Sequence, residues 1–271
     1  MLTFVPTPIG NLSDLSLRSL EVLKDAELIL CEDTRVTKRL LHLISQKLDI
    51  IFNEKEFTSV HSHNEEAFLT NENKEILLMK NVAYVSDAGM PCISDPGAML
   101  VNFCIENDIK YDVLPGANAL LTAFAMSGFS KKEFTFFGFL PHKGKDRDNQ
   151  LQSIMESSFI TILYESPHRL LKLLEQLVQK DATREIFLVK ELTKMYQQSF
   201  KGTAKEILET IKKTTIKGEW VVIIDTIVSS VGNPITLKDL EELELPPKQK
   251  AKLIAKLTGR NNKEVYNSLL M

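Results

Sequence analysis

Residues 82–96 read VAYVSDAGMPCISDP, a short apolar run followed directly by a long loop of small residues. The β-branched run 82–85 predicts a buried strand that ends in this loop. Ligands of open α/β sheets bind where strands end in such loops. Gly89 has no Cβ and would let the backbone approach a ligand closely, and Asp87 supplies a carboxylate at the end of the strand. An ordinary connection between a strand and a helix would explain this loop equally well.

Two further loops of the same kind occur in the first half of the chain. PTPIGN, residues 6–11, follows the first predicted strand, and LPGAN, residues 114–118, ends another strand and opens a helix. Three such loops suit a ligand that contains adenosine. The chain has neither GxGxxG nor GxxxxGK[ST], which argues against a nicotinamide or nucleoside-triphosphate site.

Composition limits the class of protein. The 271 residues are enough for two domains, and 44% hydrophobic with 25% charged residues is typical of a globular protein in water. The formal net charge of −3 argues against a surface that coats nucleic acid, although it allows a local basic patch. Cys31, Cys92 and Cys104 form no CxxC pair, so we expect reduced thiols. No signal peptide and no apolar run of about 20 residues is evident, so we expect a cytoplasmic protein without a membrane span.

Strand and helix patterns alternate along most of the chain and predict an α/β fold with a largely parallel first sheet. The expected strands of the first half are residues 2–5, 28–31, 50–52, 82–85 and 111–114. Helices are expected from Ser13 or Ser16 and over residues 34–44. Residues 55–62 are polar and are expected to form an irregular surface excursion.

A second unit starts around residues 134–138, and we expect its sheet to be mixed. Its expected strands are residues 159–164, 185–189 and 219–227, with helices over residues 167–179 and 203–213. The character of the sequence changes after residues 229–234, and two helices are expected over residues 248–257 and 263–270, the first stopped by Gly259. The predicted division is an N-terminal α/β domain, a C-terminal α/β domain and a small helical tail, at residues 1–128, 129–230 and 231–271.

Four motifs carry a resemblance to a known family. They are PTPIGN, EDTR, SDAGMPCISDPG and YESPHR, at residues 6–11, 32–35, 86–97 and 164–169. With the segments between them, they closely resemble the ribosomal RNA small subunit methyltransferase I family, a branch of the tetrapyrrole methylase superfamily. The resemblance runs from Leu2 to the C-terminus.

The resemblance implies two α/β domains with S-adenosylmethionine in the cleft between them. It also implies a homodimer that methylates the 2′-hydroxyl of a cytidine in small-subunit (16S) ribosomal RNA, as free RNA or in the assembled small ribosomal subunit. Carried over position by position, it assigns the cofactor to Pro8, Gly10, Ser86, Asp87, Ala88, Gly89, Pro91, Ile93, Ser94, Pro115, Gly116, Ala117, Tyr164, Leu192, Thr193 and Gly218. Two positions depart from the family pattern: Met90 stands where threonine is usual, and Ala117-Asn118 replaces Pro-Ser.

A ribose hydroxyl is a poor nucleophile, so a base or a positioned cation would assist its methylation. The ionisable candidates near predicted strand ends are Glu32, Asp33, Asp87, Lys190, Glu191 and His168. Of these, Glu191, Lys190 and Asp33 are the expected catalytic residues. An ion pair with Lys190 or Lys194 explains Glu191 slightly better than catalysis does. Asp33 is equally well explained as the cap of the helix that follows it.

Two basic segments are candidates for contacts with RNA phosphates. HKGKDR at residues 142–147 lies near the expected domain seam, and residues 248–263 contain six Lys or Arg and no acid. A solvated surface is the commoner explanation of such runs. Neither segment contains a set of aromatic residues for base stacking, so recognition through shape and backbone fits better. The expected RNA contacts are Arg35, Lys143, Lys145, Arg147, Arg169, Lys248 and Lys252.

Two other functions stay open at the level of sequence. Methylation of a small tetrapyrrole fits the wider superfamily, although a macrocycle needs neither basic segment. An RNA-binding assembly factor with a vestigial pocket is the second alternative, and the three intact loops count against it. His61 and His63 have an HxH spacing, but no further residues of ligand spacing surround them, so we expect no metal site.

Overall fold

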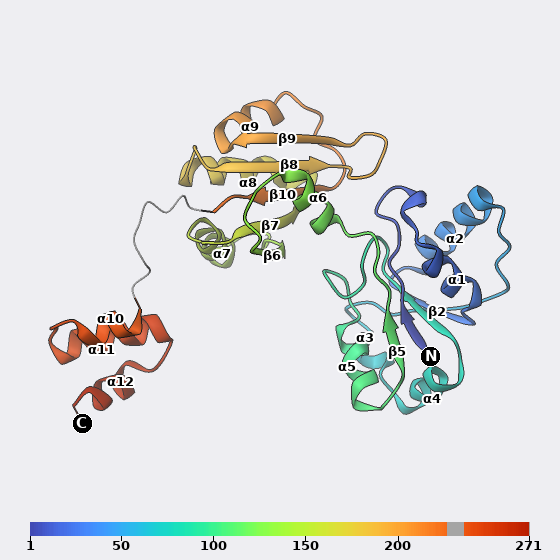
Figure 1. Ribbon diagram of the computed structural model, residues 1–271, viewed down its shortest axis with the longest axis horizontal. Coiled ribbons are helices and arrows are strands. Elements are labelled where there is room, and N and C mark those ends of the chain that lie inside the picture. The colour runs from blue at the N-terminus through green and yellow to red at the C-terminus, as the bar shows by residue number, and fades with distance from the viewer. Residues whose placement is uncertain (227–235, 271) are drawn as a thin grey trace. The chain divides into compact units, whose positions relative to one another are not determined.

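The computed structural model describes residues 1–226 and 236–270 of the chain. It contains two units, Met1–Ile227 and Val228–Met271, which we describe separately. Within the described residues, the first unit contains two five-stranded sheets with helices, and the second contains three helices (Figure 1). None of the helices in these two ranges combines the length and apolar character that a membrane span needs.

The first sheet is built from short strands that all run parallel. Its order is β3-β2-β4-β1-β5, and the strands are β1 (Leu2–Phe4), β2 (Leu28–Cys31), β3 (Glu56–Ser59), β4 (Val82–Val85) and β5 (Tyr111–Val113). In β4, Val82 and Tyr84 pack into one apolar cluster, whereas Ala83 and Val85 pack into another. Central strands that are buried on both faces read as continuous apolar runs. The expected parallel sheet is confirmed.

Most helices of this half begin at a capping side chain, whereas α3 and α5 have none. Ser16, one of the two expected caps, accepts a hydrogen bond from the Ser19 amide, and Asp33 accepts one from the Arg35 amide. The helices are η1 (Leu12–Asp14), α1 (Leu17–Asp25), α2 (Thr34–Leu48), α3 (Glu65–Phe68), α4 (Asn71–Met79), α5 (Ala98–Glu106) and α6 (Ala119–Ser127).

The second sheet is mixed, as expected. Its order is β6-β7-β10-β8-β9; β6 and β7 are parallel, and the other neighbours are antiparallel. The strands are β6 (Phe134–Phe139), β7 (Ile160–Glu165), β8 (Glu185–Lys190), β9 (Gln198–Thr203) and β10 (Trp220–Ile224). Its helices are α7 (Lys145–Met155), α8 (Pro167–Lys180) and α9 (Ala204–Ile211).

Two edge strands correct the sequence analysis. The expected strand at residues 50–52 is absent, and β3 lies instead inside residues 55–62, which we expected to be irregular. The strand β9 was not expected at all. Both are edge strands with partly exposed side chains, so their sequences EFTS and QSFKGT lack the apolar run that marks a buried strand.

The second unit has a small apolar core of its own, formed by Leu240, Ala251, Ile254 and Val265. Its helices are α10 (Leu237–Glu242), α11 (Pro247–Thr258) and α12 (Asn262–Leu269). The two expected helices are confirmed as α11 and α12, and Gly259 ends α11 in the left-handed conformation. The predicted boundary at residues 230–231 and the end of the strand expected to reach residue 227 lie outside the described residues.

Candidate active site

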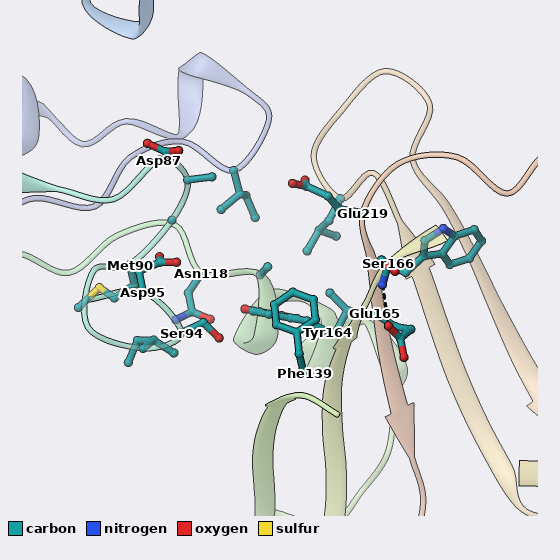
Figure 2. A pocket seen from close by; sticks show the side chains of 18 of the residues that line it. Asp87, Met90, Ser94, Asp95, Asn118, Phe139, Tyr164, Glu165, Ser166 and Glu219 are labelled. Atoms are coloured by element: carbon teal, nitrogen blue, oxygen red, sulfur yellow. Dashed lines mark hydrogen bonds between the residues drawn. The ribbon is translucent and has the colours of Figure 1, made fainter. Parts of the chain in front are cut away.

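One cavity of about 380 Å³ lies in the first unit and is lined by residues from both sheets (Figure 2). Its volume is within the range of sites for small molecules and cofactors. Seven residues expected to bind the cofactor line it: Asp87, Ala88, Gly89, Ile93, Ser94, Tyr164 and Leu192. The rest of the lining is Ile9, Met90, Asp95, Asn118, Ala119, Phe139, Glu165, Ser166, Pro167, Glu219, Trp220 and Val221.

The three loops that the sequence singled out meet at Gly89. The amides and carbonyls of Thr7 and Gly89 are joined by two backbone hydrogen bonds of 2.9 and 3.0 Å. Gly89 has φ 89°, a conformation that residues with a side chain rarely adopt. A Cβ at this position would lie 3.1 Å from Ile9 Cγ2 and 3.6 Å from the Ala117 carbonyl oxygen. The loops after β1, β4 and β5 therefore converge as expected.

Several residues assigned to the cofactor by resemblance lie behind the lining. Ser86 Oγ donates to the Gly89 carbonyl (3.1 Å), and Gly116 packs against the ring of Pro6. Gly10 packs against the Thr193 and Lys194 side chains, and Gly218 against Glu191. Nine of the residues assigned to the cofactor therefore do not line the cavity: Pro8, Gly10, Ser86, Pro91, Pro115, Gly116, Ala117, Thr193 and Gly218.

Two carboxyl groups, those of Asp87 and Asp95, line the cavity from the first half of the chain, and Glu32 lies outside the lining. Burial raises the pKa of Asp87, whose Oδ1 accepts a hydrogen bond from the Asp33 amide (3.2 Å). Burial also raises the pKa of Asp95, and of Glu32, and the charge of Asp87 raises both further. Removing these groups from water disfavours their charged form, so a cationic ligand beside them would be bound favourably.

The other side of the cavity is aromatic. Tyr164, at the end of β7, lies edge-on to Phe136 and Phe139, with ring centroids 5.0 and 5.7 Å apart. Burial raises the pKa of Tyr164 to about 12, so its hydroxyl keeps its proton at neutral pH. Figure 2 shows Tyr164 and Phe139 together, with Asp87 apart from them across the cavity. Phe139 was not among the residues expected to bind the cofactor or RNA, although it lies next to Gly138 and only four residues before Lys143.

The three catalytic candidates do not face the cavity. Lys190 is buried; its Nζ donates to the Thr215 carbonyl (3.1 Å) and lies over the Trp220 ring. Asp33 caps α2, and the hydrogen bonds from Arg35 lower its pKa to about 2, so it is a weak base. Both side chains are thus engaged in other contacts, and neither lines the cavity.

Glu191 is held by an ion pair, as the structural alternative predicted. Its Oε1 lies 3.1 Å from Lys194 Nζ and accepts a hydrogen bond from the Glu219 amide at 3.1 Å. Burial opposes the effect of these contacts, but the net result is a lowered pKa for Glu191. Glu191 therefore supports the loop that carries Leu192, which does line the cavity.

The expected RNA contacts divide into exposed and buried residues. Arg35, Lys143, Lys145, Lys248 and Lys252 are exposed, although Arg35 also pairs with Asp33 at 2.6 Å. The side chain of Arg169 is 19% exposed and donates to the Leu140 carbonyl at 2.6 Å. The expectation for Arg147 is wrong.

Arg147 is only 1% exposed and belongs to the core of the second sheet. Its Nε donates to Gln176 Oε1 (3.0 Å), and Nη1 donates to the Pro141 carbonyl (3.1 Å) and lies 3.8 Å from Glu165. Arg147 is the first residue on the buried face of α7. The charged residues before it in the sequence predict an exposed loop instead. RNA cannot reach a side chain in this position.

Among residues 1–226 and 236–270, no three His, Cys, Asp or Glu side chains come together as metal ligands would. His61 Nδ1 accepts a hydrogen bond from the His63 amide at 3.2 Å. The HxH pair thus shapes its own turn.

Comparison with known proteins identifies the family to which the chain is similar. The family described as Tetrapyrrole (Corrin/Porphyrin) Methylases matches residues 1–208. The chain is 50% identical over 270 residues to "Ribosomal RNA small subunit methyltransferase I" of Campylobacter fetus, with 100% of both chains covered. It is 45% identical over 284 residues to the protein of the same name from Helicobacter pylori, with 100% of this chain and 98% of that relative covered.

Two solved structures share the fold. Cobalt precorrin-4 methyltransferase has a TM-score of 0.59 at 15% identity, covering 83% of this chain and 94% of that one. Uroporphyrin III C-methyl transferase from Thermus thermophilus has a TM-score of 0.58 at 16% identity, covering 85% and 99%. At such identities the likeness establishes the fold alone, and the expected fold class is confirmed.

Replacing Arg147 with alanine should destabilise the first unit rather than weaken RNA binding directly. The change leaves Glu165 with one cationic partner fewer in a buried site, which costs about 3–5 kcal/mol of unfolding free energy. Trp220 is the chain's single tryptophan and is buried in this unit, so urea unfolding followed by its fluorescence reports the loss. Lys143→Ala, at an exposed position, should change stability by less than about 0.5 kcal/mol. Equal stability of the two variants would contradict the buried role.

Replacing Asp87 with asparagine should weaken the binding of S-adenosylmethionine by about tenfold or more, because a hydrogen bond from a ligand ammonium or hydroxyl group to a charged carboxylate contributes roughly 1.5–3 kcal/mol. Because burial raises the pKa of Asp87, its carboxylate takes up a proton at a higher pH than an ordinary aspartate does. Wild-type affinity should therefore fall as the pH is lowered toward the pKa of Asp87. Calorimetry between pH 8 and pH 4 should show a flatter profile for Asp87→Asn, whereas Asp146→Asn, at an exposed site, should match the wild type. Parallel profiles for all three proteins would refute this role.

Proposed function

Because the chain belongs to the tetrapyrrole methylase family and, within it, to the ribosomal RNA small subunit methyltransferase I family, we propose that it methylates small-subunit ribosomal RNA with S-adenosylmethionine. The observation that carries the proposal is the meeting of three strand-end loops at Gly89, on the wall of a cavity of about 380 Å³. The acceptor implied by the sequence resemblance is the ribose 2′-hydroxyl of a cytidine.

The residues of the cavity fit this cofactor. When bound, S-adenosylmethionine supplies an electrophilic methyl group on a positively charged sulfur. Asp87 and Asp95 provide negative charge for a cation, and Gly89 leaves room for the backbone to approach it. Leu192 and Tyr164 provide apolar and aromatic surface on the opposite side, which suits an adenine ring.

The transfer forms a bond between the ribose oxygen and the methyl carbon and breaks the bond between that carbon and sulfur. The main contribution of the protein is therefore to hold oxygen, carbon and sulfur in line. The hydroxyl proton must also leave. Asp87 and Asp95 line the cavity and have raised pKa values, so they accept a proton more readily than Asp33 or Glu191, whose pKa values are lowered.

The basic segment after β6 supports a macromolecular acceptor. Phe139 lines the cavity, and the exposed Lys143 and Lys145 follow within six residues. Arg169 fixes the intervening backbone through hydrogen bonds to the carbonyls of Leu140 (2.6 Å) and Pro141 (3.3 Å). Two lysine side chains thus follow the cavity residue Phe139 after a short segment of fixed backbone. In this position they would contact the phosphates of an RNA strand that enters the cavity. A cytoplasmic homodimer belongs to the same proposal through the sequence resemblance.

Wild-type protein should transfer labelled methyl from S-adenosylmethionine to small ribosomal subunits that lack the modification. Nuclease digestion and mass spectrometry should place the label on the 2′-oxygen of a cytidine. Protein-free ribosomal RNA and a tetrapyrrole precursor, tested in parallel, distinguish the alternative acceptors. Label on the macrocycle alone, or binding of subunits without transfer, would refute the proposal.

Neutralising Lys143 and Lys145 together should weaken binding to small ribosomal subunits and flatten its salt dependence. If each lysine meets one phosphate, the slope of log K against log salt should decrease by about 1.5. Filter binding between 50 and 200 mM salt measures this slope for Lys143→Ala/Lys145→Ala. Lys212→Ala/Lys213→Ala, which removes the same charge after α9, is the matched control. An unchanged slope in the first variant would remove these lysines from the RNA-binding surface.

A further inference from the structure

Phe139 is a large aromatic side chain that is exposed inside a hollow. It is 57% exposed and lines the cavity, whereas Trp220, which also lines it, is 2% exposed. An exposed Phe ring contributes nothing to the core, and its apolar faces are costly to leave in water. Its position therefore calls for an explanation outside folding.

A β-bulge directs Phe139 to the cavity. Along β6, Phe134 and Phe136 pack on the face of the sheet that holds Tyr164, whereas Phe137 packs into the apolar cluster of the opposite face. Regular alternation would send residue 139 to the face of Phe137. The register shifts between Phe136 and Gly138, so Phe137 is the extra residue and Phe139 pairs with Tyr164 instead. Bulges re-aim side chains in this way near functional sites.

The bulge has a specific sequence requirement. Gly138 adopts φ 63°, in the left-handed region that favours glycine. Tyr164 lies edge-on to Phe139, with ring centroids 5.7 Å apart and ring planes at 63°. The ring of Phe136 also packs against Tyr164, with centroids 5.0 Å apart. The Phe139 ring is thus supported on one side and open on the other, which is how an aromatic platform receives a second flat ring.

The open ring stands on the segment that continues to the exposed lysines. Phe139 is followed by Leu140 and Pro141, whose carbonyls are fixed by Arg169, and then by Lys143. A nucleic-acid strand that places its phosphates on these lysines would carry its bases past Phe139. Aromatic rings bind bases of single-stranded nucleic acid by stacking, without a need for hydrogen bonds.

We propose that Phe139 is a base-stacking residue for the RNA acceptor, resting on the proposed function above. The ring stacks on a base of the RNA strand as the acceptor ribose enters the cavity, and so holds the strand in position. This is a positioning contact with the substrate; the ring takes no part in the transfer itself.

The test compares four proteins for methylation of small ribosomal subunits. Phe139→Ala should lower kcat/KM about 5- to 150-fold, which corresponds to the 1–3 kcal/mol of base–aromatic stacking. Phe139→Trp should stay within about threefold of the wild type, because it keeps a stacking face. Phe139→Leu should resemble Phe139→Ala, because leucine is apolar but has no flat ring. The affinity for S-adenosylmethionine, measured by calorimetry, should stay within about twofold in all three variants.

A matched control is Phe159→Ala, which removes a Phe that is 44% exposed, outside the cavity, just before β7. It should leave kcat/KM unchanged. Wild-type activity of Phe139→Leu would show simple apolar filling and overturn the proposal, as would an equal loss of cofactor affinity, which would assign the ring to adenine. If the wild type methylates no subunits, the proposed function itself falls; if it does and Phe139→Ala is equally active, only the stacking role falls.

Discussion

The pair of backbone hydrogen bonds between Thr7 and Gly89 is the contact on which the cavity depends. These bonds join the loop after β1 to the loop after β4, although the two residues are 82 positions apart. The Thr7 hydroxyl adds a hydrogen bond to the Ser86 carbonyl at 3.2 Å, and Thr7 is buried. Buried polar groups that lose their partners are costly, so separation of the loops would be unfavourable. One glycine in a positive-φ conformation thus fixes the cavity wall and the course of two loops.

On the second sheet, a buried cluster of ion pairs holds together the segments that line the cavity. Glu165 is 2% exposed, lines the cavity and lies 3.1 Å from Arg169 and 3.8 Å from Arg147. Both arginines also donate to the Pro141 carbonyl. The cluster therefore connects the end of β7, the start of α8 and the backbone after β6, and it explains the acid and the arginine of the YESPHR motif as positioning residues. A group of charges removed from water is stable only while its partners are in place.

The sequence predicted the loops of the site, which depend on short local patterns. It did not predict which charged side chains face the cavity or solvent. A strand that ends at glycine is visible in a short window, so the loops around Gly89 and Ala117 were found. Lys190 and Arg147 carry the right charge for catalysis and for RNA, but their direction depends on which face of a strand or helix they occupy. The lining from β10 was missed for a related reason. Its residues Trp220 and Val221 read as ordinary core, and only the pairing of β10 between β7 and β8 brings them to the cavity.

The fold by itself does not select an acceptor, because the same architecture is found in proteins named for tetrapyrrole substrates. In the proposed function, the three converging loops serve the methyl donor, and the acceptor approaches from solvent. Acceptor choice must therefore depend on the rim of the cavity. In this chain the rim includes the end of β6, where one inserted residue moves an aromatic ring from the core face to the cavity. Because a single-residue shift in a strand exchanges its two faces, a bulge alters the mouth of the cavity while leaving the loops at Gly89 in place. The same scaffold can therefore change its acceptor without rebuilding the site that holds the donor.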